Sequence, residues 1–164
     1  MKFRIKDRVI LGAFSGALST TLLNFLDFLS IILHTNEWHI WQIAGSLFFT
    51  QEELKTIIAL VLGGITHTTL TSCVGVVICY ILFFTGRSLY IIKGIGVFLL
   101  FWIILFGGTL RLGITSISQP LGVPTNFAHF TGHLLDGILT SFFIIKFGDK
   151  KVWKKPIPTL MKVE

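Results

Sequence analysis

A histidine and aspartate stripe in the last third of the chain is the first pattern that could do chemistry. His129 and His133 are four residues apart, and Asp136 follows three residues later. In a helix these spacings place all three side chains on one face. Two imidazoles one turn apart can bind a metal ion, with the carboxylate as a third ligand or as a group that orients a histidine. The stripe could instead accept protons, contact a substrate or form a satisfied structural network, and the residues leave these alternatives open.

Three further ionisable residues stand in otherwise apolar surroundings: Asp27, His67 and Arg111. Ionisable groups are unfavourable inside a bilayer, so they usually face a bundle interior, a cavity or a partner. Arg111 could neutralise Asp27 or Asp136, and the histidines could exchange protons near neutral pH. These residues are therefore candidates for the same site as the stripe, provided that the elements that carry them come together.

Those elements are predicted to be membrane-spanning helices. The chain has 164 residues, 52% of them apolar and only 13% charged, with a mean hydropathy of +0.80. A soluble domain carries about 25% charged residues, so this chain cannot cover a water-facing surface. Because about 20 apolar residues cross the hydrocarbon as a helix, four apolar stretches predict an all-α polytopic membrane protein with one four-helix bundle. The predicted spans are about 9–33, 56–85, 90–110 and 126–147.

The distribution of Lys and Arg predicts the orientation of these spans. Twelve of the 14 basic residues precede the first span, lie between the second and third, or follow the fourth. Cytoplasmic loops carry the excess of basic residues, so both termini are expected in the cytoplasm. The single domain is predicted over 1–148, with a frayed basic tail over 149–164. The basic residues therefore indicate membrane topology, and nucleic acid is not expected as a partner.

In this topology the ionisable residues of all four spans fall in the outer half of the bilayer. They predict one polar pocket that opens outward. Its predicted lining is Asp27, His67, Arg111, His129, His133 and Asp136.

The outer loops carry aromatic, acidic and helix-capping residues. Trp38 and Trp41 predict a short interfacial helix between the first two spans, and His34 and His39 are expected at the rim above the pocket. Thr50 and Glu53 match a capping box, which predicts a helix that begins near Gln51. Pro120, Gly122 and Pro124 are expected to break any helix before the fourth span, which Thr125 or Asn126 could cap.

Small residues predict where helices approach closely. Gly12 and Gly16 form a G-x-x-x-G pattern in the first span, and Gly64 and Gly75 lie on one stripe of the second. Ser19, Thr20 and Asp27 share the helical face of the first pair of glycines. These faces are expected to pack against other helices.

The layout resembles that of small bacterial four-helix membrane proteins of the YqhR kind. The shared features are the basic start, the Trp-bearing first outer loop, the long second span and the Pro-containing last outer loop. An aromatic third span that ends in Gly-Gly-Thr-Leu-Arg and a final span that reads Gly-His-Leu-Leu-Asp-Gly-Ile-Leu complete the likeness. The resemblance implies a bacterial cytoplasmic membrane, and it transfers no site residues.

Three functions follow from the sequence. The leading hypothesis is a protein without classical enzymatic activity, whose pocket binds or relays a proton, a cation or a small polar ligand. The second is a metal-dependent membrane enzyme with His129, His133 and His67 as ligands and an acidic residue such as Asp136 as base or orienter. The third is an accessory or scaffolding subunit of a larger membrane complex. The expected partners are the lipid bilayer and either a homo-oligomer or a larger complex, and a divalent metal ion is the only cofactor considered.

Overall fold

The computed structural model describes residues 3–32, 37–117 and 121–154. These parts of the chain are helical and contain no strand. The elements are α1 (Arg8–Ile32), α2 (Ile40–Gly45), η1 (Glu53–Lys55), α3 (Ile57–Thr85), α4 (Tyr90–Trp102), η2 (Ile103–Thr109), α5 (Val123–Phe147) and η3 (Lys150–Trp153). Both η1 and η3 are 3-10 helices, whereas η2 is a π-helical continuation of α4.

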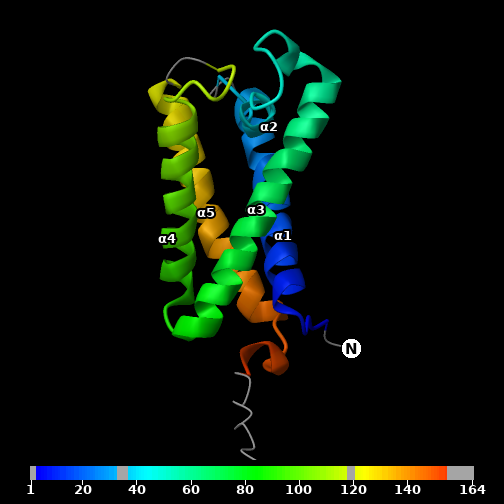
Figure 1. Cartoon of the computed structure of the whole chain (residues 1–164), viewed down its shortest axis with the longest axis vertical. Coiled ribbons are helices and arrows are strands. Elements are labelled where there is room, and N and C mark those ends of the chain that lie inside the picture. The colour runs from blue at the N-terminus through cyan, green and yellow to red at the C-terminus, as the bar shows by residue number, and fades with distance from the viewer. Residues whose placement is uncertain (1–2, 33–36, 118–120, 155–164) are drawn as a thin grey trace, which may run out of the picture.

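Four helical segments among the described residues are long and apolar enough to cross a membrane: α1, α3, α4 with η2, and α5. This confirms the all-α class and the four expected long helices. Helix α1 packs along α3, α4 packs along α5, and a contact between α1 and α5 joins the two pairs (Figure 1). The short helix expected between the first two spans is present as α2, at the end of the bundle opposite the N-terminal segment.

Glycines set the distance between α1 and α3. A Cβ atom on Gly16 would lie 2.2 Å from the carbonyl oxygen of Thr71, and one on Gly75 would lie 2.2 Å from that of Gly12. The two backbones are therefore in direct contact, and no side chain fits between them. Gly64 approaches a different element, because a Cβ there would lie 3.1 Å from the ring of Trp41 in α2.

Two predicted helix starts are wrong. Helix α3 begins at Ile57, and its N-cap is Thr56, whose Oγ1 accepts a hydrogen bond of 3.3 Å from the N–H of Ala59. The N–H and the hydroxyl of Thr50 both donate to Glu53 over 2.9 Å, so this pair closes an isolated turn. Capping residues occur twice within seven positions here, and the extended backbone of Thr56 separates the turn from the helix.

The start of α5 also differs from its prediction. The helix begins at Val123 after Gly122, with Pro124 inside the first turn. Proline is tolerated there because the N–H groups of the first turn have no partner within the helix. Thr125 is not a cap, since its Oγ1 accepts a 3.0 Å hydrogen bond from the N–H of Glu37, and the Asn126 amide donates to the carbonyl of Leu121 over 2.6 Å.

The N-terminal segment is joined to the chain that follows α5. The N–H of Ile5 donates to the carbonyl of Phe147, and the N–H of Asp149 donates to the carbonyl of Ile5, both over 2.9 Å. Arg4 and Arg8 donate further hydrogen bonds to carbonyls between positions 146 and 154. Residues 149–154 are thus a docked 3-10 helix and not the frayed tail that was predicted; residues 155–164 lie outside the described part.

Candidate functional site

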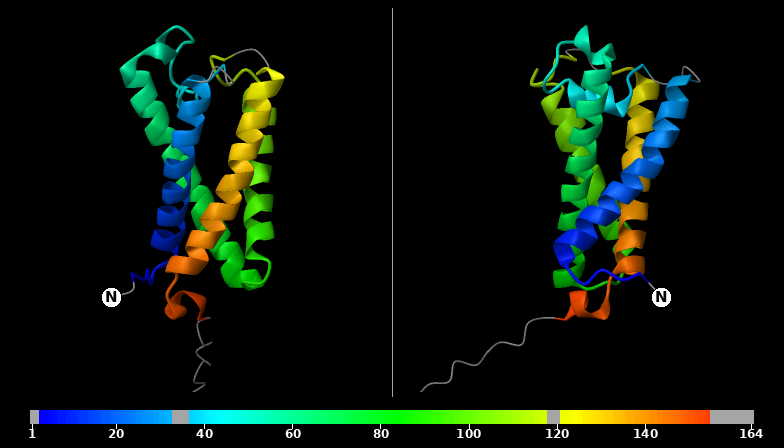
Figure 2. Two further views of the ribbon diagram at one scale, coloured as in Figure 1. Left: turned by 180° about the vertical axis from the view of Figure 1, so that it is seen from behind. Right: turned by 90° about the vertical axis from the view of Figure 1, so that its right-hand side faces the viewer.

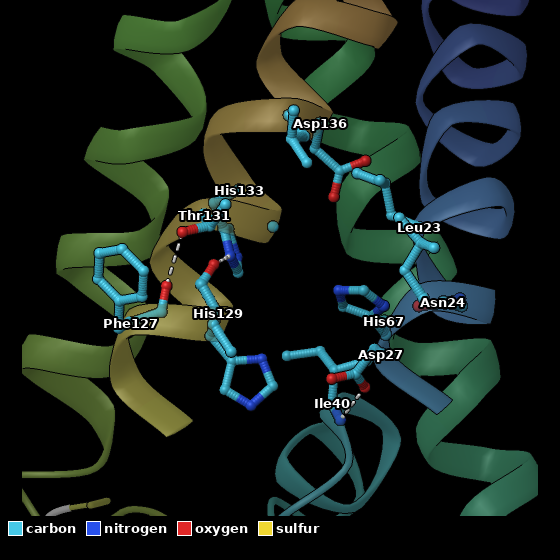
Figure 3. A pocket seen from close by; sticks show the side chains of 14 residues that line it. Leu23, Asn24, Asp27, Ile40, His67, Phe127, His129, Thr131, His133 and Asp136 are labelled. Atoms are coloured by element: carbon cyan, nitrogen blue, oxygen red, sulfur yellow. Dashed lines mark hydrogen bonds between the residues drawn. The ribbon is translucent and has the colours of Figure 1, made fainter. Parts of the chain in front are cut away.

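A cavity of about 320 Å³ lies between α1 and α5, near the end of the bundle that carries α2 (Figure 3). Five of the six residues predicted to form one pocket line it, and they come from three long helices. They are Asp27 on α1, His67 on α3, and His129, His133 and Asp136 on α5. The remaining lining is mostly apolar: Leu23, Asn24, Leu26, Ile40, Phe127, Ala128, Thr131, Gly132 and Leu135.

Arg111 does not join this group, so its predicted place in the pocket is wrong. Its side chain is exposed and lines a different cavity, together with Trp102, Leu110 and Asn126. The direction of its side chain depends on the π-helical turns of η2, which end at Thr109, two residues before Arg111. Such turns change the angle at which every later residue leaves the helix.

Asp136 lies at the inner end of the cavity and is almost fully buried. Its Oδ1 accepts a 2.7 Å hydrogen bond from the hydroxyl of Ser19, and its Oδ2 accepts one of 3.4 Å from that of Thr20. Both hydroxyls are completely buried on α1. Sequence reasoning placed Ser19 and Thr20 on the same face as Asp27 without assigning them to the site. Their role as donors to Asp136 depends on the packing of α1 against α5.

Asp27 fixes the start of α2 at the outer end of the cavity. Its Oδ2 accepts a 2.8 Å hydrogen bond from the N–H of Ile40 and lies 3.4 Å from Nε2 of His39. Nδ1 of His39 accepts from the N–H of Trp41, so Nε2 carries the proton that faces Asp27. Burial lowers the pKa of His39, and the negative charge of Asp27 partly offsets this effect. His34 lies outside the described residues.

The hydrogen bonds of His129 and His133 determine which ring nitrogens are protonated. Nε2 of His129 lies 3.3 Å from the carbonyl oxygen of Trp38, and Nδ1 of His133 lies 2.8 Å from that of His129. A carbonyl only accepts, so both of these nitrogens carry hydrogen. In the neutral rings, Nδ1 of His129 and Nε2 of His133 are therefore hydrogen-bond acceptors. The packing thus leaves an unprotonated nitrogen on each of two neighbouring imidazoles.

His67 is buried without a full set of hydrogen bonds. Its side chain comes from α3, and its ring lies toward the cavity that α1 and α5 enclose (Figure 3). The residue is only 8% exposed, and its Nδ1 has no hydrogen-bond partner within the described part of the chain. A buried polar atom left unpaired destabilises a fold by roughly 1–3 kcal/mol. Such an atom next to a cavity is a place where a ligand can supply the missing hydrogen bond.

The π-helix η2 packs an aromatic ring against the two histidines of the stripe. Its Phe106 ring centroid lies 5.3 Å from that of His129 and 5.6 Å from that of His133. Phe106 was not among the residues that the sequence predicted for the site. No pattern in the local sequence predicts the change from α- to π-helical turns. Such turns are frequent at functional sites.

The ionisable residues that line the cavity are carboxylates and imidazoles, and neither Lys nor Arg is among them. The cavity therefore offers more hydrogen-bond acceptors than donors and favours a ligand that donates hydrogen bonds or carries positive charge. Within the described ranges, no three His, Cys, Asp or Glu side chains are placed to hold one metal ion. The predicted metal site of His129, His133 and Asp136 stays a prediction.

Comparison of the sequence and the structure with family models, curated proteins and solved structures finds no match. The resemblance to the YqhR kind of protein therefore stays a prediction.

Proposed function

We propose that the chain is a polytopic protein of a bacterial cytoplasmic membrane, with both termini in the cytoplasm, which binds a small cation that donates hydrogen bonds. The binding site is the cavity between α1 and α5. The observation that carries this proposal is the unpaired Nδ1 of buried His67, next to a cavity whose other ionisable groups are Asp27, His129, His133 and Asp136.

Charge and hydrogen bonding favour the same class of ligand. Two carboxylates line the cavity, and the described residues that line it include neither Lys nor Arg, so a bound cation would be attracted and an anion repelled. The two tautomers deduced for His129 and His133 present acceptor nitrogens, which an N–H or O–H donor satisfies. A protonated primary amine has three such donors and one positive charge. A proton held or relayed by the same imidazoles and carboxylates is the smallest member of this class.

Methylammonium is a suitable probe, with the full chain reconstituted in lipid nanodiscs and its histidine rings labelled with 15N. We expect the ring signals of His67 and His133 to shift saturably as methylammonium chloride is added, relative to sodium chloride at the same ionic strength. The ring of His39 should shift less, because both of its nitrogens already have partners.

Variants of one helix provide the control. His67→Phe removes the unpaired nitrogen but keeps an aromatic ring. In this variant, the methylammonium concentration that half-shifts the ring signal of His133 should rise at least tenfold. Thr66→Val changes the neighbouring residue, whose hydroxyl bonds only to the carbonyl of Leu62 on its own helix, and it should bind like the unmodified protein. Histidine signals that respond equally to both salts would refute the proposed function.

A further inference from the structure

The route into the cavity is restricted at its outer end, where the sequence predicted an opening to water. Residues 37–40 lie across this end and are bonded to both flanking helices. The N–H of Glu37 donates to Thr125 on α5, the carbonyl of Trp38 accepts from His129 on α5, and the N–H of Ile40 donates to Asp27 on α1. These three hydrogen bonds connect α1 and α5 through one short segment. Among the described residues, they hold this segment across the path along the axis of the bundle.

Two further sides of the cavity are closed by packing. At the inner end, Ser19 and Thr20 of α1 are hydrogen-bonded to Asp136 of α5, so the two helices are in contact there. His67 of α3 lies behind the cavity, on a helix that packs directly against α1. A ligand therefore does not reach the site from the inner end or through α3.

The remaining side is the space between α1 and α5. The two helices diverge from their contact toward the end that carries α2 (Figure 2, left). Leu26 of α1 and Phe127 of α5 line the cavity here, and these residues are 52% and 69% exposed. Exposed apolar side chains on a helix of this hydropathy are suited to contact with lipid. The opening is thus lined by apolar groups, while the imidazoles and carboxylates lie deeper.

We infer that the ligand is an amphiphile, with a protonated amine on a single apolar chain, which enters from the bilayer between α1 and α5. This inference rests on the proposed function and adds the chain and the lateral route. A cavity of 320 Å³ equals the volume of about ten water molecules, which is enough for an amine head and its first few carbons. The rest of the chain would lie against Leu26 and Phe127 in the lipid. An anionic phospholipid head is disfavoured as the occupant, because neither Lys nor Arg is among the described residues that line the cavity.

The test compares four probes in nanodiscs, with the histidine ring signals as the readout. Dodecylammonium has the charge, the donors and the chain; dodecyltrimethylammonium has the charge and the chain but no N–H donor. Dodecyl sulfate has the chain with the opposite charge, and methylammonium lacks the chain. We expect dodecylammonium to shift His67 and His133 at a concentration at least tenfold below that needed for methylammonium. The trimethyl compound and the sulfate, each at a concentration below that which unfolds the protein, should leave both rings unchanged.

Two substitutions test the lateral route. Leu26→Trp fills the opening. It should raise at least tenfold the dodecylammonium concentration needed to shift the ring signals of His67 and His133. Phe84→Trp enlarges a residue that is 67% exposed at the C-terminal end of α3, and it should change the effective dodecylammonium concentration less than twofold. A dodecylamine that carries a diazirine in the middle of its chain tests the lateral route in the unmodified protein by photolabelling. On illumination it should label the peptides that contain positions 26 and 127, and unlabelled dodecylamine should compete.

The outcomes separate the two proposals. If methylammonium and dodecylammonium act at the same concentration and Leu26→Trp changes neither, the lateral route is wrong and the proposed function stands. If dodecyltrimethylammonium acts like dodecylammonium, the amphiphile binds by partition alone and the inference is overturned. If neither amine shifts the rings of His67 and His133, the proposed function itself fails.

Discussion

Replacement of Gly16 by alanine should separate α1 from α3 and destabilise the bundle. The added Cβ would lie 2.2 Å from the carbonyl oxygen and 2.9 Å from the carbonyl carbon of Thr71, whereas ordinary contacts begin near 3.4 Å. The neighbour is backbone, so no side chain can turn aside to make room. The helices must move apart by about 1 Å, and the close contact along the glycine face is lost.

The magnitude follows from two opposing effects. Overpacking of a well-packed contact costs about 1–3 kcal/mol, and the replacement of glycine by alanine inside a helix gains about 0.5–1 kcal/mol. We expect the free energy of unfolding to fall by about 1 kcal/mol, the difference between the middle values of these two ranges. Gly96→Ala on α4 is the matched control, because a Cβ there has no atom within 4 Å. It should leave the protein unchanged or slightly more stable.

The assay is reversible unfolding in mixed micelles of increasing dodecyl sulfate content, followed by circular dichroism and tryptophan fluorescence. The midpoint for Gly16→Ala should move to a lower detergent fraction, and the midpoint for Gly96→Ala should not. Equal midpoints for Gly16→Ala and the unmodified protein would show that the backbones of α1 and α3 are not in contact.

Three other perturbations test the site and the orientation. Ser19→Ala removes a 2.7 Å hydrogen bond to a buried carboxylate and should lower the free energy of unfolding by about 1.5–3 kcal/mol; Thr21→Ala, which affects an exposed hydroxyl bonded to its own helix, should change it little by the same detergent titration. Burial lowers the pKa of His39 below its ordinary value of 6.5, so the folded protein keeps this ring neutral. The corresponding stability is present above pH 6.5 and is lost as the pH falls below it, because the unfolded chain then binds the proton more strongly; His39→Asn, which retains an N-cap residue, should unfold with a weaker pH dependence. A cysteine at exposed position 37 should react with an impermeant maleimide from outside the cell, and one at exposed position 87 only after the membrane is opened; the reverse pattern would contradict the proposed orientation of Glu37 and Arg87.

Composition and spacing predicted the elements and most of the site, because both depend on local properties. The charge-poor stretches gave the four long helices, and the spacing of His129, His133 and Asp136 placed them on one face of α5. What the sequence could not supply was the direction of residues that follow an irregular turn. Arg111 comes after the π-helix and faces another cavity.

The pocket's opening is a second property that the sequence did not determine. Asp27 was recognised as an ionisable residue in an apolar span, but the sequence could not show that it accepts a hydrogen bond from the backbone N–H of Ile40. Any residue except proline has a backbone N–H, so a hydrogen bond to backbone cannot be recognised from residue types. The position of segment 37–40 over the cavity could therefore not be predicted. Five of the six residues predicted for the pocket share one cavity, and the exposed apolar residues Leu26 and Phe127 line it between α1 and α5.

The attachment of the N-terminal segment to the end of α5 bears on the order in which the chain folds. Arg4 and Arg8 bond to carbonyls that lie 142 to 146 residues later in the sequence. Synthesis at about 5–20 residues per second separates the two partners by roughly 10–30 s. Helices α1 and α3 are closer to each other in the sequence, so the contact between them can form earlier during synthesis. The N-terminal segment therefore settles only after the last long helix is complete, so its docking marks the end of folding, and chains that stop before residue 147 would keep this segment undocked.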